Sequence, residues 1–577
     1  MMEKRGIIAI ILTFLIIVIW SFVQSKLFPP EPVKEVKKEQ AVPLEQKKEV
    51  QEEKSALSNG VKPFPLVKEI ASKEVSIETQ KYWAVFTNED ARLKHFKLKK
   101  YKDRVEESSM TIKLTQFVEG LLGRKSEEAK KPGPLDLVNT TKEEGLPLGL
   151  TVLNSQSPFV AGNWEVDKEK LNVVNPGEKG EVTFEKSLEN GLKVLKRYRF
   201  HSEDDIIDIE VEVQNPTSKE ATIQLGLEWI GKIELAKLAD EGNKDFGLNY
   251  AFLKNQKVEK KEFGGGSSGG CVPSCGPQSK TIEPFDSSER GEIKWFSFGG
   301  EYFSAMMIPP PAAKDLALSV KGNEKGILRA TIAPSPVPIP PQQSVKIPYR
   351  IYVGPKDENQ LKAIGVEAEK LVDFGWFTIV AKPLLWFINL THTATRNFGI
   401  DIIIISILIK IIFLPLTQIS FKSMKEMQKV QPEMSRLRET YKNDKARLQQ
   451  EIMLLYKRRK INPMSGCLPM VIQIPAFIAL YNALQNTIEM RHAPFFLWIQ
   501  DLSAKDPIYI TPLIMGATMV IQQKMTPTAA DPNQAKMMLL MPVMFTFLFL
   551  SFPSGLVLYW LVNNVLSIAH QYYLNKK

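Results

Sequence analysis

The sequence predicts a multi-pass α-helical membrane protein that also carries a large antiparallel β-sandwich domain outside the membrane. Three observations indicate this class. Long apolar runs occur at the N-terminus and after about residue 375, whereas the interval between them is polar and alternating. The formal net charge of +10 is concentrated beside the apolar runs. Because cations there mark the cytoplasmic side of a membrane, we favour membrane topology over nucleic-acid binding.

The first apolar run predicts a signal-anchor span within residues 1–28. Lys4 and Arg5 precede an apolar stretch from Ile7 to Val23. This stretch approaches the roughly 20 residues that cross a bilayer and exceeds the core of a cleavable signal. No small-residue cleavage site follows it. We therefore expect an uncleaved span with its N-terminus in the cytoplasm, the alternative being a cleaved signal peptide.

Residues 29–64 predict a disordered linker, because Pro, Lys, Glu and Gln leave too little apolar surface to form a core. Residues 65–355 predict the β domain. Their short alternating runs, such as "IIDIEVEVQN" and "ATIQLGLEWI", are typical of strands with one buried face. No motif surrounds the histidines of this block, and no two carboxylates have a spacing that indicates a catalytic pair. We therefore expect a binding or scaffolding role.

Cys271 and Cys275 lie in a Gly/Ser-rich loop of the same block. A local disulfide and two incidental thiols are both compatible with this sequence.

Residues 356–397 predict a connector with an amphipathic helix at about 374–390 that lies on the membrane surface. Residues 398–577 then predict a membrane core. With the N-terminal span, the apolar segments give six spans in all, the last five at about 398–417, 464–487, 508–523, 537–551 and 556–573. Pro553 and Gly555 in "FPSG" predict a tight turn between the last two.

The charges of the loops predict the orientation of these spans. Residues 418–463 contain twelve Lys and Arg against five Asp and Glu, whereas residues 488–507 contain two against three. The first loop is therefore expected in the cytoplasm and the second outside. Lys576 and Lys577 then end the chain in the cytoplasm, as six spans require.

The basic loop 418–463 also predicts a helical hairpin. Pro432 is placed to begin one helix, "KND" ends it, and Leu448, Ile452 and Leu455 line a second. The hairpin is either a solvated topology signal or a surface for anionic lipid, ribosomal RNA or an arriving polypeptide. Its candidate contact residues are Arg436, Arg438, Lys442, Lys445, Arg447, Lys457, Arg458, Arg459 and Lys460.

Lys410 lies inside the apolar segment "DIIIISILIKIIFLPL". A cation at the centre of a span costs about 2.5–3.5 kcal/mol on insertion scales. It is therefore retained only where it contacts water, pairs with another group or has a function. Snorkelling to the interface is one explanation. A water-filled cavity is the other, and we prefer it because polar residues recur in the same spans. These are Ser406, Gln473, Tyr559 with Asn563, and Trp560 with Asn564, and Pro469 is a structural residue one turn before Gln473.

Four segments of the membrane core strongly resemble the YidC/Oxa/Albino family of membrane-protein insertases. They are "DIIIISILIKIIFLPLT", "KINPMSGCLPMVIQIPAFIALYNAL", "APFFLWIQDLSAKDPIYITPLIMG" and "MPVMFTFLFLSFPSGLVLYWLVNN". The resemblance covers roughly residues 370–575 and is looser through the β domain, where "WFSFGGEYFSAMMIP" and "YVGPKDENQLK" are similar to the Gram-negative members.

This resemblance implies a fold in which five spans enclose a hydrophilic groove, open to cytoplasm and lipid and closed to the outside. The groove of the family carries one positive residue, typically arginine, and the matching position here is Lys410. Lysine keeps the charge but lacks the planar fork of donors. Ser406, Gln473, Tyr559 and Trp560 match groove or substrate-contacting positions, and the periplasmic β domain is similar to the family's supersandwich.

The expected function is therefore insertion and folding of client membrane proteins, without enzyme activity or cofactor. Nascent membrane proteins and the bilayer are the expected partners, the Sec translocon and the ribosome are left open, and neither DNA nor a nucleotide is expected, since no G-x-x-x-x-G-K loop is present. The alternative is an anion transporter or channel with a midplane lysine, although the internal repeats typical of transporters are not evident. A third hypothesis is a membrane-tethered carbohydrate enzyme.

Overall fold

The computed structural model of this chain describes residues 70–577, except 107–108, 122–130, 154–160, 189, 235–244, 248, 263–281, 312, 460–467, 526–531 and 577. The predicted signal anchor, the linker, Cys271, Cys275 and Lys460 lie outside the described residues.

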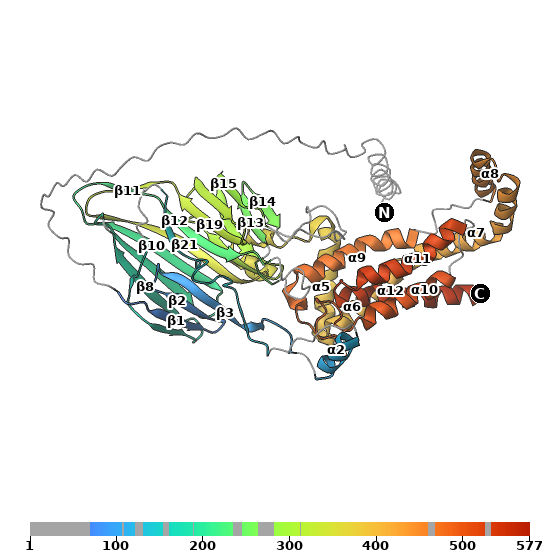
Figure 1. Cartoon of the computed structure of the whole chain (residues 1–577), viewed down its shortest axis with the longest axis horizontal. Helices are drawn as coiled ribbons and strands as arrows, with labels where there is room; N and C mark the ends of the chain where they lie inside the picture. Colours follow the sequence, from blue (N-terminus) through green and yellow to red (C-terminus); the bar gives the residue numbers. More distant parts are fainter. Residues whose placement is uncertain are drawn as a thin grey trace, which may run out of the picture. The chain divides into compact units, whose positions relative to one another are not determined.

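Strands fill the first half of the described chain, which we call the β domain (Figure 1). The largest sheet has nine strands, in the order β14 (Lys257–Glu262), β13 (Asn249–Lys254), β16 (Ile293–Gly299), β17 (Phe303–Ile308), β21 (Gln343–Pro355), β10 (Ile206–Asn215), β9 (Lys193–His201), β8 (Lys179–Ser187) and β6 (Glu165–Val166).

Two five-stranded sheets and one two-stranded sheet complete the β domain. The first is ordered β4 (Pro134–Asp136), β3 (Arg92–Lys102), β2 (Tyr82–Thr87), β1 (Glu74–Thr79) and β7 (Lys170–Val173). The second is ordered β15 (Phe285–Gly291), β18 (Leu316–Gly322), β19 (Ile327–Pro334), β12 (Leu225–Lys232) and β5 (Leu150–Val152). The small sheet pairs β11 (Ala221–Ile223) with β20 (Val337–Ile339). Among the pairings described, all are antiparallel except that of β1 with β7.

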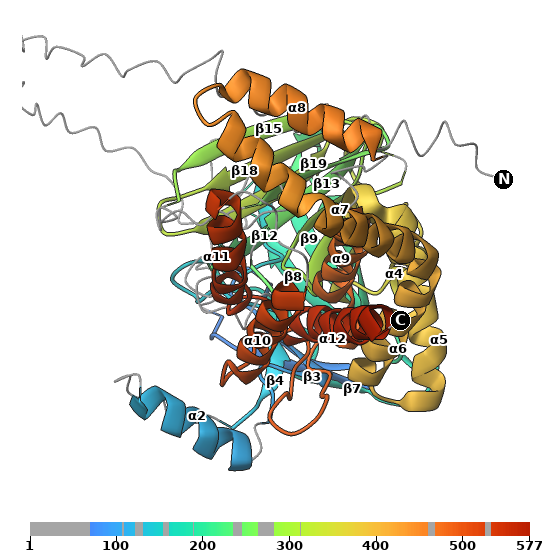
Figure 2. The ribbon, with the colours of Figure 1, turned by 90° about the vertical axis from the view of Figure 1, so that its right-hand side faces the viewer.

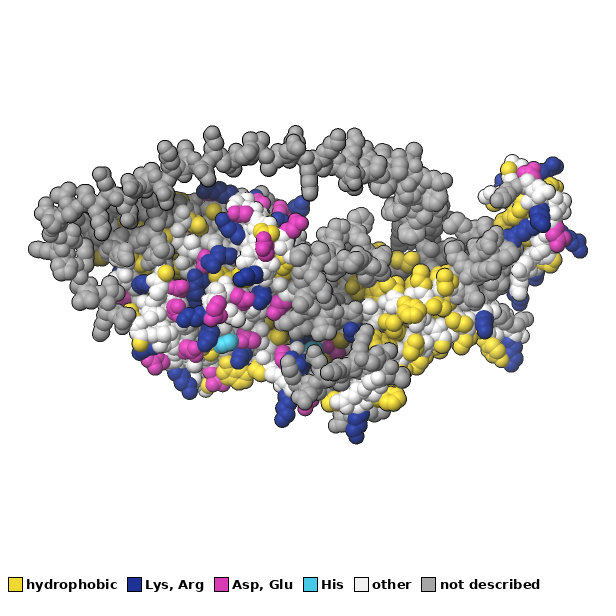
Figure 3. All heavy atoms as spheres, in the orientation of Figure 1, with side chains coloured by type: hydrophobic (Ala, Val, Ile, Leu, Met, Phe, Trp, Pro, Cys, Tyr) yellow, Lys and Arg dark blue, Asp and Glu magenta, His cyan; other side chains and the backbone are white. Residues whose placement is uncertain are grey.

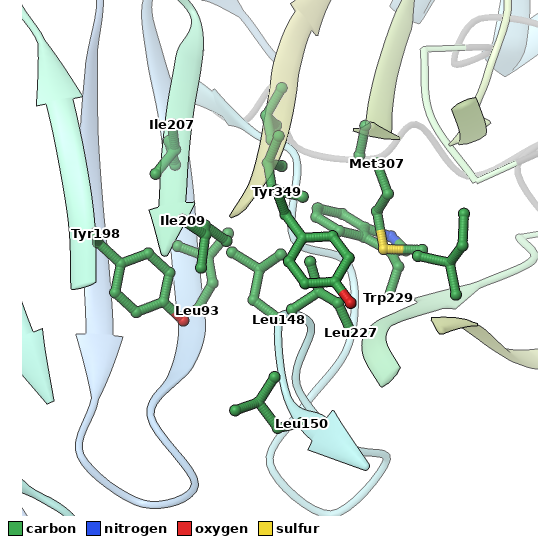
Figure 4. Packing of buried hydrophobic residues seen from close by; sticks show 14 of the residues in the cluster. Leu93, Leu148, Leu150, Tyr198, Ile207, Ile209, Leu227, Trp229, Met307 and Tyr349 are labelled. Atoms are coloured by element: carbon green, nitrogen blue, oxygen red, sulfur yellow. The ribbon is translucent and has the colours of Figure 1, made fainter. Parts of the chain in front are cut away.

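Alternation along the strands builds the core of the β domain. In β10, Ile207, Ile209, Val211 and Val213 are buried, and Ile209 lies opposite Tyr198 of β9 and Tyr349 of β21. Figure 4 shows Tyr198, Ile209 and Tyr349 of the nine-stranded sheet among residues that come from the facing segments, including Leu93, Leu148, Leu227 and Trp229. The buried faces of the sheets therefore meet in one hydrophobic core.

Lys196 of β9 is fully buried in this core. Its Nζ donates to the carbonyl of Ala91 at 3.0 Å and to that of Leu148, and it lies 5.1 Å from the centroid of the Tyr198 ring. Burial, with a smaller repulsion from Arg92, holds the pKa of Lys196 well below its ordinary value of 10.5. At pH values between that lowered pKa and 10.5, Lys196 therefore carries a proton in the unfolded chain but not in the folded chain.

We expect the free energy of unfolding to rise with pH across this window, and the variant Lys196→Met to lose that rise. Urea unfolding of the full chain, followed by tryptophan fluorescence from about pH 7 to about pH 10, measures the slope. Lys179→Met, at an exposed position of β8, is the matched control and should keep it. An unchanged slope in Lys196→Met would contradict the prediction.

Helices make up most of the second half of the described chain (Figure 2). In chain order after β21 they are α4 (Glu358–Ile364), η1 (Ala368–Leu371), η2 (Gly375–Phe377), α5 (Thr378–Thr395), α6 (Phe398–Ile412), α7 (Leu414–Thr440), α8 (Lys445–Arg458), α9 (Leu468–Asn486), η4 (Ile488–Met490), α10 (Ile510–Met525), α11 (Pro532–Phe549) and α12 (Ser554–Lys576). One further helix, α2 (Ser109–Leu121), follows β3 in the β domain. α12 packs against α6, α9 and α10, and α5 packs against α6 and α9.

The helices after β21 are shorter or less apolar than the predicted spans require. Taken singly, no helix in the described part of the chain is long and apolar enough to cross a bilayer. α6 and α7 together have the length and the apolar composition of a span, as a pair bent by 59°. The number of six spans therefore stays a prediction.

The span predicted at about 398–417 is not one continuous helix, because α6 ends at Ile412 and α7 begins at Leu414. Pro415 explains the break. Proline has no N–H for the helix, its ring clashes with the carbonyl four residues earlier, and it disfavours helical geometry in the preceding residue. The N–H of Phe413 closes α6 by donating to the carbonyls of Ile409 and Ile411.

The prediction that Pro432 begins a helix is also wrong, since Pro432 lies inside α7. Buried side chains on both sides of it, Val430 and Met434, pack with Leu455 of α8 in one small cluster. This continuous contact compensates for the hydrogen bond that proline removes. α7 and α8 therefore form a hairpin whose first helix is longer than expected.

Candidate functional site

Lys410 lies in the last turn of α6, just before the bend. The C-terminus of a helix carries partial negative charge, which favours a cation. Its Nζ donates to Ser567 Oγ of α12 at 2.5 Å, and Ser567 Oγ donates in turn to the carbonyl of Asn563 at 2.7 Å. The lysine is therefore held by a helix terminus and by a polar chain on a second helix, which the sequence did not reveal.

A pocket opens beside Lys410. Residues from α6, α7, α9 and α12 converge on it: Ile409, Lys410, Phe413, Leu416, Thr417, Gln473 and Asn563. Three of the predicted groove residues, Lys410, Gln473 and Asn563, thus share this pocket.

Ser406, Tyr559 and Trp560, also predicted for the groove, lie outside the pocket lining. Ser406 is buried and donates to the carbonyl of Ile402 in its own helix at 2.6 Å. Tyr559 is fully buried, and its hydroxyl lies close to Gln473 and Asn563 without a hydrogen bond of normal geometry. Trp560 packs in an aromatic cluster, with ring centroids 5.1 Å from Phe477 and 5.2 Å from Phe549.

The predicted turn residues occupy two different places. Pro469 lies in the first turn of α9. Pro553 and Gly555 precede or open α12, where the N–H of Gly555 donates to the carbonyl of Leu502 at 2.9 Å. A Cβ at Gly555 would lie 3.1 Å from that carbonyl and 3.1 Å from Leu484 Cδ2, so this close approach favours glycine. The turn thereby ties the start of α12 to the loop after α9.

Sequence reasoning missed Ser567, Thr417 and His570. Asn563, Ser567, His570 and Gln571 recur at helical spacing on α12, and this stripe was the available signal. Both ring nitrogens of His570 are buried without a hydrogen-bond partner among the described residues, and the ring lies 5.4 Å from that of Phe421. A further missed residue, Asp401 at the start of α6, is fully buried and accepts from Thr395 at 2.7 Å beside His392 Nδ1 at 2.8 Å.

Exposed hydrophobic side chains gather on the helical part of the chain. Figure 3 shows them gathered over the helices, whereas charges of both signs are interspersed over the strands. On α11, Leu540, Val543, Met544 and Phe547 form one exposed row, and on α5 the exposed row is Ile379, Trp386 and Leu390. Patches of this extent on a helical surface favour contact with lipid or with another apolar helix.

The hairpin presents most of its predicted cations to solvent. Arg436, Lys442, Arg447, Lys457, Arg458 and Arg459 are exposed, and Arg438 is half-buried. Arg459 pairs with Glu433, and the Arg447 guanidinium lies 5.4 Å from the centroid of the Tyr441 ring. Within the described ranges, no group of three or more His, Cys, Asp or Glu side chains is placed to hold a metal ion.

Comparison with known proteins covers both parts of the chain. Residues 74–387 match the family described as the YidC periplasmic domain, and residues 390–577 match the 60Kd inner membrane protein family. A membrane protein insertase YidC from Syntrophus aciditrophicus is 39% identical over 590 residues, covering 100% of each chain. The chain belongs to the YidC family of membrane protein insertases. A second YidC insertase, from Geotalea daltonii, is 38% identical over 581 residues, covering 100% of this chain and 99% of the relative.

Solved YidC structures were also found. An active YidC insertase with its first transmembrane domain resolved shares 18% identity at a TM-score of 0.36, covering 87% of this chain and 92% of that one. YidC from Thermotoga maritima shares 14% identity at a TM-score of 0.29, covering 86% and 99%.

YidC membership confirms the family expected from the sequence and its class of function, membrane protein insertion. It also confirms an inner-membrane protein with a β-rich periplasmic domain, and it does not favour an anion transporter.

Proposed function

We propose that the pocket beside Lys410 receives a polar segment of the client during insertion. The observation that carries this proposal is the convergence of one cation and two amide side chains, Gln473 and Asn563, from three helices on one pocket. An acidic client segment is attracted by Lys410, while the amides replace part of its water. The pocket thus shortens the distance that polar groups cross in a low-dielectric medium.

The apolar part of the client is proposed to lie against α9 and α11. The exposed row on α11, including Met544 and Phe547, supports this role. Methionine adapts to partners of varied shape, which suits clients of different sequence. Burial of the client's apolar surface, at about 25 cal/mol per Å², supplies the driving force in place of a nucleotide.

The proposed topology has six spans with both termini in the cytoplasm. Its support is the excess of Lys and Arg in residues 418–463. The hairpin of α7 and α8 then faces the cytoplasm, where its exposed cations offer a contact for the client, for anionic lipid or for ribosomal RNA. The surface helix is proposed to be α5, with its exposed apolar row in the outer leaflet.

Photocrosslinking tests where the client lies. A photoreactive residue at Leu416 or Gln473, both lining the pocket, is expected to crosslink to a stalled single-span client with an acidic tail. The same probe at Trp83, an exposed position of the β domain, is the control and should give only background. Equal yields from the pocket positions and from position 83 would overturn the proposed route.

A further inference from the structure

The C-terminal end of α9 is fastened to the β domain. The hydroxyl of Tyr302, just before β17, donates to the carbonyl of Leu484 at 3.0 Å. Carbonyls in the last turn of a helix lack partners within the helix, so this bond satisfies one of them. Two residues after α9 ends, Ile488 packs as a buried member of the hydrophobic core of the β domain.

Arg491 completes this junction with a buried, two-pronged ion pair. Its Nε and Nη2 each lie 2.5 Å from one carboxylate oxygen of Asp245 in the β domain. The two side chains are only 3% and 6% exposed. Nη2 also donates to the carbonyl of Lys102, the last residue of β3, at 2.7 Å. The guanidinium lies 5.1 Å from the centroid of the Phe303 ring. Because the fork is planar, these partners fix its orientation as well as its position.

The fastened helix is the one that brings Gln473 to the pocket. Gln473 and the end of α9 at Asn486 are separated by about 20 Å along the helix axis at 1.5 Å per residue. α9 runs over this distance as one helix, with Pro475 inside it, so holding its C-terminal end restricts how its other end tilts toward α12. Hydrophobic contacts alone permit sliding, whereas the directional bonds of Arg491 and Tyr302 do not.

We propose that the β domain holds α9 in a fixed orientation, with Arg491 and Asp245 as positioning residues of the insertase. The pair keeps the pocket side of α9 and its apolar surface at a fixed angle to the rest of the helices. This role goes beyond the proposed function of Lys410, because it applies whichever client group enters the pocket.

Two variants of the full-length protein separate positioning from folding. Arg491→Met removes the Arg491 cation from the buried Asp245 carboxylate, which destabilises the junction. Arg491→Met combined with Asp245→Asn removes both charges and is expected to fold, since paired replacement of buried ions is often neutral. We expect both variants to insert a single-span client into proteoliposomes about tenfold more slowly, the double variant no worse than the single one, as for residues that act as a unit. Arg491→Lys should restore part of the rate, because it returns the charge but not the fork.

Amide hydrogen exchange supplies the structural readout. In both variants the last turn of α9 and residues 488–492 should lose protection, while the strands of the nine-stranded sheet keep it. Arg197→Met is the matched control. It removes an ion pair of the same kind inside the β domain, where Arg197 lies 2.8 Å from Glu210 and 2.6 Å from Glu212. This control should leave both insertion and exchange at α9 unchanged.

Three outcomes would overturn the proposal that the β domain holds α9 in a fixed orientation. The double variant could lose protection at the end of α9 yet insert at the wild-type rate. It could instead retain full protection there. Arg197→Met could slow insertion as much as Arg491→Met. Lys410→Ala distinguishes this proposal from that of the pocket, because it should slow insertion with no change of exchange in α9.

Discussion

Lys410→Ala is expected to slow insertion of a single-span client with an acidic tail about 5- to 30-fold. The estimate follows from an attraction of about 1–2 kcal/mol between unit charges about 8 Å apart at an effective dielectric of about 20–40. Lys410→Arg keeps the charge and should insert the same client at close to the wild-type rate. Insertion into proteoliposomes, scored by protease protection of the client, measures both.

A second client separates the charge of Lys410 from its packing. A client whose tail carries no acidic residue should be inserted almost equally by the wild type and by Lys410→Ala. Ser567→Ala removes the hydroxyl that Lys410 contacts at 2.5 Å but leaves the cation, so its effect should be small. Wild-type insertion of the acidic client by Lys410→Ala would remove the electrostatic role of the pocket.

Gly399→Ala is expected to destabilise the helical region by about 1–3 kcal/mol, the usual cost of overpacking. Gly399 lies in the first turn of α6, and a Cβ there would come within 2.0 Å of Phe495 Cδ2. The ring cannot retreat easily, because the Phe495 backbone is tied to Asn397 Nδ2 at 3.2 Å and to the carbonyl of Ile499 at 2.9 Å. Thermal unfolding of the purified protein in detergent measures the loss.

The matched control for this substitution is Gly120→Ala. Gly120 is also a helical glycine, in α2, but a Cβ there would meet no atom within 4 Å. Alanine is favoured over glycine in helices by up to about 1 kcal/mol, so this variant should be neutral or slightly more stable. Combining Gly399→Ala with Phe495→Leu should recover part of the loss. A Gly399→Ala protein as stable as Gly120→Ala would show that the ring moves aside freely.

Local patterns predicted the strands well, because burial of one face imposes a period of two. The run "IIDIEVEVQN" is β10, and its Ile and Val residues at alternate positions are buried. Helix ends were predicted less well. The apolar run around Lys410 suggested one continuous span, and it hid the signal of Pro415, which ends α6 early. Pro432 gave the opposite error, because packing against α8 carries α7 through it.

Three of the seven residues that line the pocket could be predicted from polar residues in apolar spans, since such residues cluster away from lipid. That reasoning identified Lys410, Gln473 and Asn563. It also selected Trp560, which packs in an aromatic cluster and does not line the pocket. The pairing of Arg491 with Asp245 could not be predicted at all. The two residues are 246 positions apart, and neither lies in a local motif.

The 59° bend between α6 and α7 gives the hairpin a lever arm. α7 has 27 residues, so it extends about 40 Å from the residue next to the pocket lining to the tip. A rotation of about 10° at Phe413 would move that tip by about 7 Å. Small angular changes beside Lys410 are thus magnified at the place where the hairpin turns, and large displacements of the hairpin require little rearrangement at the pocket.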